Sequence, residues 1–154
     1  MFVADLHNDV LQRAIIGEDI SVRTNNGHSD LIRLQESCID LEVFVVWVAD
    51  KNSKERAYLK ANELYDKLEY LEKENEFIKI TKTVKDIKET IKNNILATPI
   101  AIEGGEPLEE NIENLHHFIE RGLFYLGPTW NHSLSWVSSG YDEIHNKKNI
   151  QSYG

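Results

Sequence analysis

The stretch Leu41-Glu42-Val43-Phe44-Val45-Val46-Trp47-Val48-Ala49 decides the fold class of this chain. Its residues are almost all β-branched, aromatic or aliphatic, without the polar alternation of a strand that faces water on one side. Such a run is typical of a strand buried on both faces, and strands of that kind belong to parallel sheets covered by helices. We therefore predict a strand over residues 41–49 in the interior of an α/β sheet.

Strand and helix patterns alternate on both sides of this run. The other expected strands are residues 2–6, 77–80, 98–102 and 123–126. The spacing of apolar residues predicts helices over residues 10–16, from Asp30, over 53–74, from Thr83, and from Pro107 to Gly122. Thr83 and Asp86 have the spacing of a capping box, and Asp30 is expected to cap the helix that it opens.

This alternation predicts parallel strands separated by helices, in the order of the amino-terminal half of a (β/α)8 TIM-type barrel. A closed barrel takes about 250 residues, whereas the chain has 154. We therefore expect residues 1–154 to form a single incomplete (β/α) barrel domain that lacks the carboxyl-terminal half. A smaller open α/β sheet is the alternative.

The composition, with 41% hydrophobic and 28% charged residues, is typical of an ordinary soluble globular domain. The formal charge of −9 argues against non-specific nucleic-acid binding, because such binding needs a basic surface. The longest apolar run, residues 43–49, is far shorter than the about 20 residues of a membrane span. No basic-then-apolar leader opens the chain, and its single cysteine suits a reducing compartment, so we expect a cytoplasmic protein. We expect this residue, Cys38, to be buried.

Polar side chains with metal-binding chemistry occur where two of the predicted strands end. In the segment Asp5-Leu6-His7-Asn8-Asp9, the alternation of an extended chain puts His7 and Asp9 on one face and Asn8 on the other. Glu103 follows the strand at 98–102 and precedes two glycines, which permit a tight turn. An imidazole nitrogen and carboxylate oxygens are ligands of a divalent metal such as zinc. His7, Asp9 and Glu103 are therefore the candidate metal ligands.

Other histidines compete with this assignment. The segment His28-Ser29-Asp30 repeats the His-x-Asp spacing, but it opens a helix, and a cap role for Asp30 is the better interpretation. His116 and His117 are expected on a partly exposed helix face. His145 lies in an irregular tail and is not expected to be a ligand.

Five segments follow one another along essentially the whole chain: Asp5-Leu6-His7-Asn8-Asp9, Asp30-Leu31-Ile32-Arg33-Leu34, Phe44-Val45-Val46-Trp47-Val48, Ile102-Glu103-Gly104-Gly105 and Thr129-Trp130-Asn131. Together and in this order they resemble the membrane (renal) dipeptidase family. The resemblance implies an amidohydrolase-type barrel, a binuclear zinc site and the hydrolysis of dipeptides by a metal-bridging hydroxide. Carried over residue by residue, it implies that His7 and Asp9 bind one zinc ion and that Glu103 bridges both. Other amidohydrolases fit less well, since they usually open with His-x-His and here the third residue is Asp9.

Two departures from the family pattern bear on activity. Where well-studied relatives have a His that polarises the substrate carbonyl, this chain has Trp130, and nearby His132 is the candidate catalytic replacement. The family's second half, which supplies two further His ligands and an Asp, has no counterpart in this sequence. We therefore expect a dipeptide hydrolase whose site is completed by a separate second-half chain or by a homo-oligomer. The alternative is a catalytically inactive metal- or peptide-binding remnant.

Overall fold

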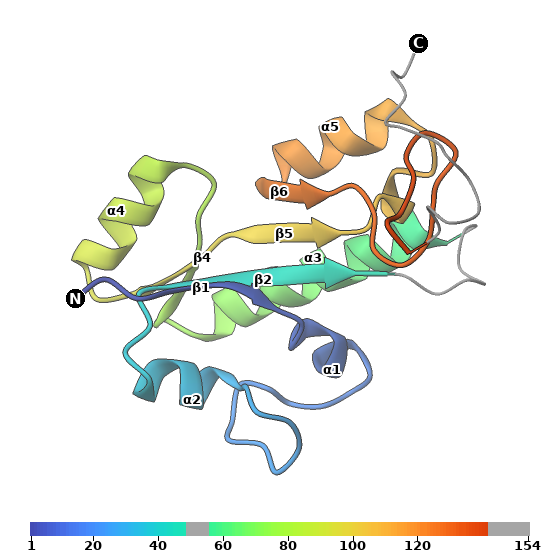
Figure 1. The fold of residues 1–154 in the computed structure, drawn as a ribbon. Coiled ribbons are helices and arrows are strands. Elements are labelled where there is room, and N and C mark those ends of the chain that lie inside the picture. The colour runs from blue at the N-terminus through green and yellow to red at the C-terminus, as the bar shows by residue number, and fades with distance from the viewer. Residues whose placement is uncertain (49–55, 142–154) are drawn as a thin grey trace.

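The computed structural model describes residues 1–48 and 56–141, which form a parallel sheet with helices along it (Figure 1). The strands are β1 (Ala4–Asn8), β2 (Leu41–Trp47), β3 (Ile78–Ile80), β4 (Leu96–Thr98), β5 (Ile100–Glu103) and β6 (Leu123–Gly127). The helices are α1 (Leu11–Ile15), α2 (Leu31–Glu36), α3 (Ala57–Glu74), α4 (Val84–Lys92) and α5 (Ile112–Glu120), with a 3-10 turn, η1, at Glu106–Leu108. Strand and helix alternate as the sequence predicts, and the α/β fold with a parallel sheet is confirmed.

The order of the strands brings four carboxyl ends together. β1 and β5 pair with β2 on its two sides, and β6 pairs with β5, all in parallel. β4 also pairs with β2, at Leu41 and Ala97, and β3 adds to β4 at the amino-terminal end of the sheet. The arrowheads of β1, β2, β5 and β6 consequently point to the same end of the molecule (Figure 1). In parallel α/β folds this is the end at which functional side chains collect.

β2 is buried on both faces, as its sequence predicts. Phe44 and Val46 belong to the large core between the sheet and the helices, which includes the apolar face of α3. Val43 and Val45 belong to a smaller cluster on the opposite face, which the side chains of α4 and Tyr125 partly cover. The prediction of a strand over residues 41–49 is therefore confirmed for Leu41–Trp47, while Ala49 lies outside the described residues.

Local sequence signals set several helix ends. Asp30 accepts a hydrogen bond from the backbone N–H of Arg33, at 2.8 Å, and so caps α2. Thr83 and Asp86 form the predicted capping box of α4. α3 begins at Ala57, and residues 53–55 of its predicted range lie outside the described residues. Within 1–48 and 56–141, no helix has the length and apolar character that crossing a bilayer requires.

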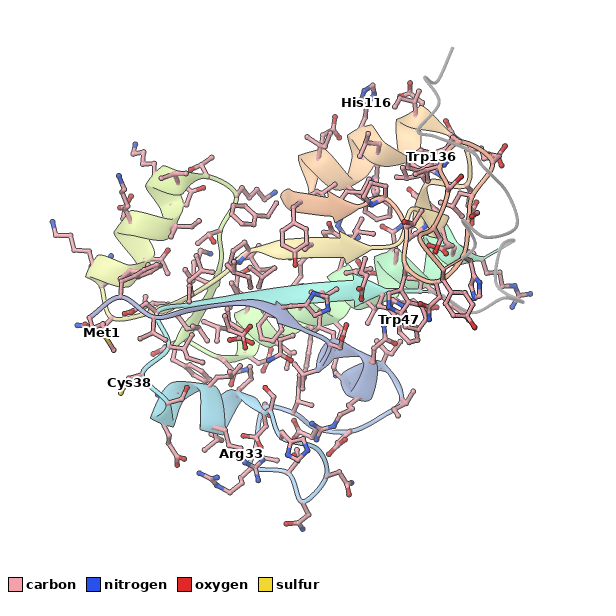
Figure 2. All side chains as sticks on the ribbon, viewed as in Figure 1. Met1, Arg33, Cys38, Trp47, His116 and Trp136 are labelled. Carbon is pink, nitrogen blue, oxygen red and sulfur yellow. The ribbon has the colours of Figure 1, made fainter. Side chains whose placement is uncertain are left out.

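Three local predictions need correction. The strand expected over 98–102 is split into β4 and β5 around Pro99, which has no N–H to donate to a ladder. The helix expected from Pro107 to Gly122 is a 3-10 turn followed by α5, because Glu109 and Glu110 adopt φ values of 48° and 57° that cannot continue a right-handed helix. Cys38 is exposed rather than buried, because it lies in the turn after α2, where its backbone is left-handed with a φ of 57° (Figure 2).

Candidate metal centre

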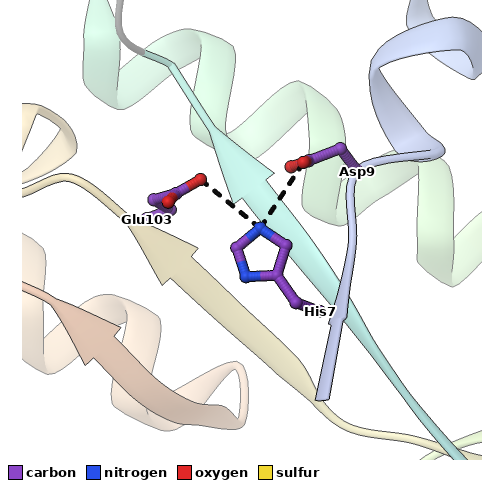
Figure 3. Close-up of side chains that lie close together, drawn as sticks. All are labelled: His7, Asp9 and Glu103. Atoms are coloured by element: carbon purple, nitrogen blue, oxygen red, sulfur yellow. Dashed lines mark ion pairs between the residues drawn. The ribbon is translucent and has the colours of Figure 1, made fainter. Parts of the chain in front are cut away.

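His7, Asp9 and Glu103 converge at the carboxyl ends of β1 and β5 (Figure 3). His7 lies in β1, Asp9 follows the end of that strand, and Glu103 is the last residue of β5. Because β1 and β5 flank β2, the three side chains meet over the carboxyl end of β2. The Nε2 atom of His7 lies 3.4 Å from Oδ2 of Asp9 and 3.4 Å from Oε2 of Glu103.

These separations fit the chemistry of a divalent metal. A tetrahedral ion with ligand bonds of about 2.0–2.2 Å holds its ligand atoms about 3.3–3.6 Å apart, and both measured distances from His7 fall in that range. One ligand atom from each residue lies within 4.8 Å of the others. An imidazole nitrogen with two carboxylate oxygens is a donor set that suits zinc and related metals. The residues present therefore fit a metal.

The electrostatics of the cluster depend on partial burial of Glu103. Burial raises the pKa of the Glu103 carboxyl, the neighbouring His7 lowers it, and the negative charge of Asp9 raises it again. The net direction is upward. His7 and Asp9 are more exposed than Glu103, with 44% and 50% of their side-chain surfaces accessible against 26%. A cation bound here would compete with a proton for Glu103, so its affinity should rise with pH.

Tyr125 is a residue of this site that the sequence analysis missed. It lies on β6 opposite Ala101, on the same face of the sheet as the cluster, and its hydroxyl donates to the carbonyl oxygen of Leu6 at 2.6 Å. Burial raises the pKa of the Tyr125 phenol, and the charges of Glu103, Asp9 and Asp5 raise it further. The phenol therefore remains a neutral donor beside the carboxylates. No signal in the sequence relates Tyr125 to β1, because the contact depends on the curvature of the sheet.

Comparison with known proteins identifies the family. The family model of the membrane dipeptidases, peptidase family M19, matches residues 1–154. The chain belongs to this family. Membership confirms the resemblance seen in the five sequence segments and implies a metallopeptidase-type site.

Similar proteins are about twice as long as this chain. An uncharacterized protein in the PQQ-III 3′ region of Acinetobacter calcoaceticus is 30% identical in an alignment of 156 positions, which covers 84% of this chain and 49% of that protein. Dipeptidase AC, a metallopeptidase of family M19, has a TM-score of 0.77 at 24% identity, over 85% of this chain and 43% of that one. A metallopeptidase from Rhodobacter sphaeroides, liganded with a phosphinate mimic of the dipeptide L-Ala-D-Ala, has a TM-score of 0.77 at 22% identity, over 85% and 46%. The chain thus spans about half the length of these relatives.

Two tryptophan rings pack against each other at the carboxyl end of β2. Trp47 ends β2 and is the register partner of Glu103 on β5 (Figure 2). The ring of Trp130 packs edge-on against that of Trp47, with centroids 5.1 Å apart and planes at 80°. Trp130, at the position where the resemblance leads us to expect a His, therefore adds an apolar ring beside the register partner of Glu103.

The turn after Glu103 requires both of its glycines, as their position in the sequence predicts. Gly104 has a φ of +88°, and its N–H donates to the Gly127 carbonyl at 2.9 Å. The N–H of Gly105 donates to the carbonyl of Pro128 at 3.0 Å. A Cβ on Gly105 would lie 2.6 Å from the ring of Trp136 and 2.9 Å from the Pro128 oxygen. This close approach joins the Glu103 turn to the loop after β6.

The remaining predicted site residues lie elsewhere. His132 is half-buried in the loop after β6 and is not in the three-residue cluster, so its catalytic role stays a prediction. Asp30 of the rival His-x-Asp pair is a fully buried helix cap, which confirms the interpretation preferred from the sequence. His116 lies on the exposed side of α5, near Glu113, and His117 contacts Asn62 at 2.7 Å (Figure 2). His145 lies outside the described residues.

Proposed function

We propose that this chain carries part of the active site of a zinc-dependent, dipeptidase-like hydrolase that cleaves the peptide bond of dipeptides. The observation that carries the proposal is the convergence of His7, Asp9 and Glu103 in a chain of the membrane dipeptidase family. In such a site a metal lowers the pKa of water and stabilises negative charge on the carbonyl oxygen.

The residues of this chain would have separate roles in the site. His7 and Asp9 would hold one metal ion, and Glu103, on β5 at the other side of β2, would be the ligand shared with a second ion. The rings of Trp47 and Trp130 pack against each other next to Glu103 and would limit the access of water from that side, which strengthens electrostatic interactions. His132, on the loop after β6, is the candidate for a hydrogen bond to the substrate carbonyl. Its replacement by alanine should lower kcat and leave the metal content unchanged.

The substrate class is a small peptide with a free amino and a free carboxyl group. The Rhodobacter sphaeroides relative binds a phosphinate mimic of L-Ala-D-Ala, which supports a test of dipeptides with either configuration at the second residue. A panel of L,L- and L,D-dipeptides with small side chains is therefore the first choice.

Completion of the site requires residues beyond those described. Leu6 on β1 and Phe124 on β6, at the two outer strands of the curved array, are 59% and 43% exposed. The outer edges of β1 and β6, which pair with no further strand among the described residues, suit the addition of strands from a second-half chain or from a second copy of this chain, and the exposed apolar side chains suit a covering surface. Sedimentation of the 154-residue chain should show association, alone or with a second-half chain. A stable monomer that associates neither with itself nor with a second-half chain would contradict this part of the proposal.

The decisive experiment measures zinc per chain and zinc-dependent hydrolysis of the dipeptide panel. We expect bound zinc in the wild type and its loss in His7→Ala and Glu103→Ala. His116→Ala is the matched control, because it removes an imidazole from the exposed face of α5 and should retain zinc. Zinc binding without turnover, with or without a partner, would favour the alternative of an inactive metal- or peptide-binding remnant. Absence of zinc binding under all these conditions would overturn the proposed metal site.

A further inference from the structure

Asn8 lies between the two candidate ligands His7 and Asp9, and its side chain is bound on the opposite face of β1. Its Nδ2 group donates to Oγ of Ser29 at 2.9 Å and to Oε1 of Glu42. Its Oδ1 atom accepts from the N–H of Val10 at 3.0 Å. The amide therefore uses both N–H bonds and one oxygen lone pair to fix the chain directly around the ligands.

The strand ladder does not hold this part of β1 in regular register. Ala4 and Asp5 are the register partners of Leu41 and Glu42, whereas Asn8 is the partner of Phe44. Three steps along β1 thus correspond to two along β2, which is the pattern of a β-bulge. The N–H of His7 instead donates to Oδ1 of Asp5, at 3.1 Å. The backbone that carries the ligands consequently needs another source of rigidity.

Glu42 is an unusual residue for the interior of a sheet. Its side chain is fully buried, and its second oxygen, Oε2, has no hydrogen-bond partner among the described residues. Such an arrangement is less favourable for folding than an apolar side chain of the same size. Its contact with Asn8 gives Glu42 a role that an apolar residue could not fill.

Ser29, which accepts a hydrogen bond from the Asn8 side chain, is itself held in place by Arg13. The carbonyl of Ser29 accepts from Nη1 of Arg13 at 2.8 Å, and Arg13 also forms an ion pair with Glu18 at 2.6 Å. Asn8 therefore joins β1 to β2 through Glu42 and to the loop before α2 through Ser29. Both attachments lie on the side away from the candidate metal.

We propose that Asn8 and Glu42 form a positioning pair that fixes the bulged end of β1, and with it His7 and Asp9, from the face opposite the metal site. This inference rests on the proposed function, because it assigns the pair a purpose only if His7 and Asp9 bind a metal. Groups that orient metal ligands typically change metal affinity by about 10- to 100-fold when they are removed.

The test compares variants of the 154-residue chain by zinc affinity and by amide hydrogen exchange of Val10 in the metal-free protein. Asn8→Ala removes all three hydrogen bonds of the Asn8 side chain. Glu42→Leu removes the buried acceptor Oε1, and Ser29→Ala removes only the acceptor Oγ of Ser29. Glu42→Gln keeps an oxygen that accepts from Asn8 and should restore the wild-type behaviour. Thr98→Val is the matched control, since Thr98 is also fully buried and its side-chain oxygen has no hydrogen-bond partner among the described residues, but it lies in β4.

We expect Asn8→Ala and Glu42→Leu to weaken zinc binding about 10- to 100-fold and to speed the exchange of the Val10 amide, whereas Glu42→Gln and Thr98→Val do neither. Wild-type zinc affinity in folded Asn8→Ala and Glu42→Leu would overturn the positioning role and leave the metal site standing. If the wild type binds no zinc, the proposed function fails and this inference fails with it. In that case, faster Val10 exchange in Asn8→Ala would show only a structural role for Asn8.

Discussion

The hydroxyl of Tyr125 donates a 2.6 Å hydrogen bond to the carbonyl oxygen of Leu6, although the two residues lie on β6 and β1. Two strands, β2 and β5, separate them in the sheet. Neighbouring strands are about 4.8 Å apart, so in a flat sheet a tyrosine could not reach across. The contact therefore requires a strongly curved sheet, whose concave face holds His7, Asp9 and Glu103.

Tyr125→Phe should loosen this curvature. The variant keeps the ring packed on the smaller cluster that contains Val43 and Val45, but it leaves the Leu6 carbonyl without this donor. We therefore expect the free energy of unfolding to fall by about 1 kcal/mol. Urea denaturation measures the change. Tyr70→Phe is the control, because Tyr70 is 55% exposed on α3 and its ring contact with Lys67 survives the substitution. Equal losses in the two variants would contradict a specific role for the Tyr125 hydroxyl.

Glu42 should make the protein more stable in mild acid than in mild base. The pKa of Glu42 is raised to about 7. Burial is the main cause, the charge of Asp5 adds to it, and the hydrogen bond from Asn8 opposes it. Because the folded state binds this proton more tightly than the unfolded state, the associated stability is present at low pH and is lost as the pH rises through about 7.

The measurement compares unfolding free energies of the wild type and Glu42→Gln at pH 5 and pH 8. The wild type should lose about 2–3 kcal/mol more than the variant over this interval, since glutamine does not titrate. The difference between the two proteins removes the contribution of the histidines, which they share. Parallel pH dependences would show that Glu42 titrates normally.

Gly105→Ala should destabilise the turn that follows Glu103. The new Cβ would approach the Trp136 ring and the Pro128 carbonyl to within 3 Å, and the carbonyl belongs to backbone that cannot easily move. We expect a loss of about 1–3 kcal/mol in the free energy of unfolding, measured by denaturant titration. Gly140→Ala, where a Cβ would meet nothing within 4 Å, should be close to neutral. A neutral Gly105→Ala would contradict the observed close approach.

The two predicted helix caps should differ in their contributions to stability. Asp30 is fully buried and accepts hydrogen bonds from the backbone N–H groups of Arg33 and Thr24, at 2.8 and 3.1 Å. Asp30→Ala leaves these donors unpaired and should cost about 2–4 kcal/mol. Thr83→Ala removes an exposed capping box and should cost about 1 kcal/mol. Thermal or urea unfolding of both variants tests whether Asp30→Ala loses more stability than Thr83→Ala. Equal losses in the free energy of unfolding would contradict the prediction.

Much of the fold is readable from short segments. The apolar run at β2 predicts a strand buried on both faces, and the caps at Asp30 and Thr83 predict the starts of α2 and α4, because each depends on residues close together in the chain. Alternation along β1 also predicts that His7 and Asp9 share a face. The breaks at Pro99 and at Glu109 and Glu110 were missed, because helix and strand periodicity continues across them while the backbone does not.

The sequence by itself determined the alternation of strands and helices, the family, and the three residue types that suit a metal. Only the tertiary structure decided that their atoms meet at 3.4 Å, that Tyr125 reaches β1, and that Glu42 supports Asn8 from the opposite face. The physical reason is that helix caps and strand burial depend on neighbours in the chain. The site depends instead on strand register and sheet curvature, which arise when segments far apart in the sequence pack together.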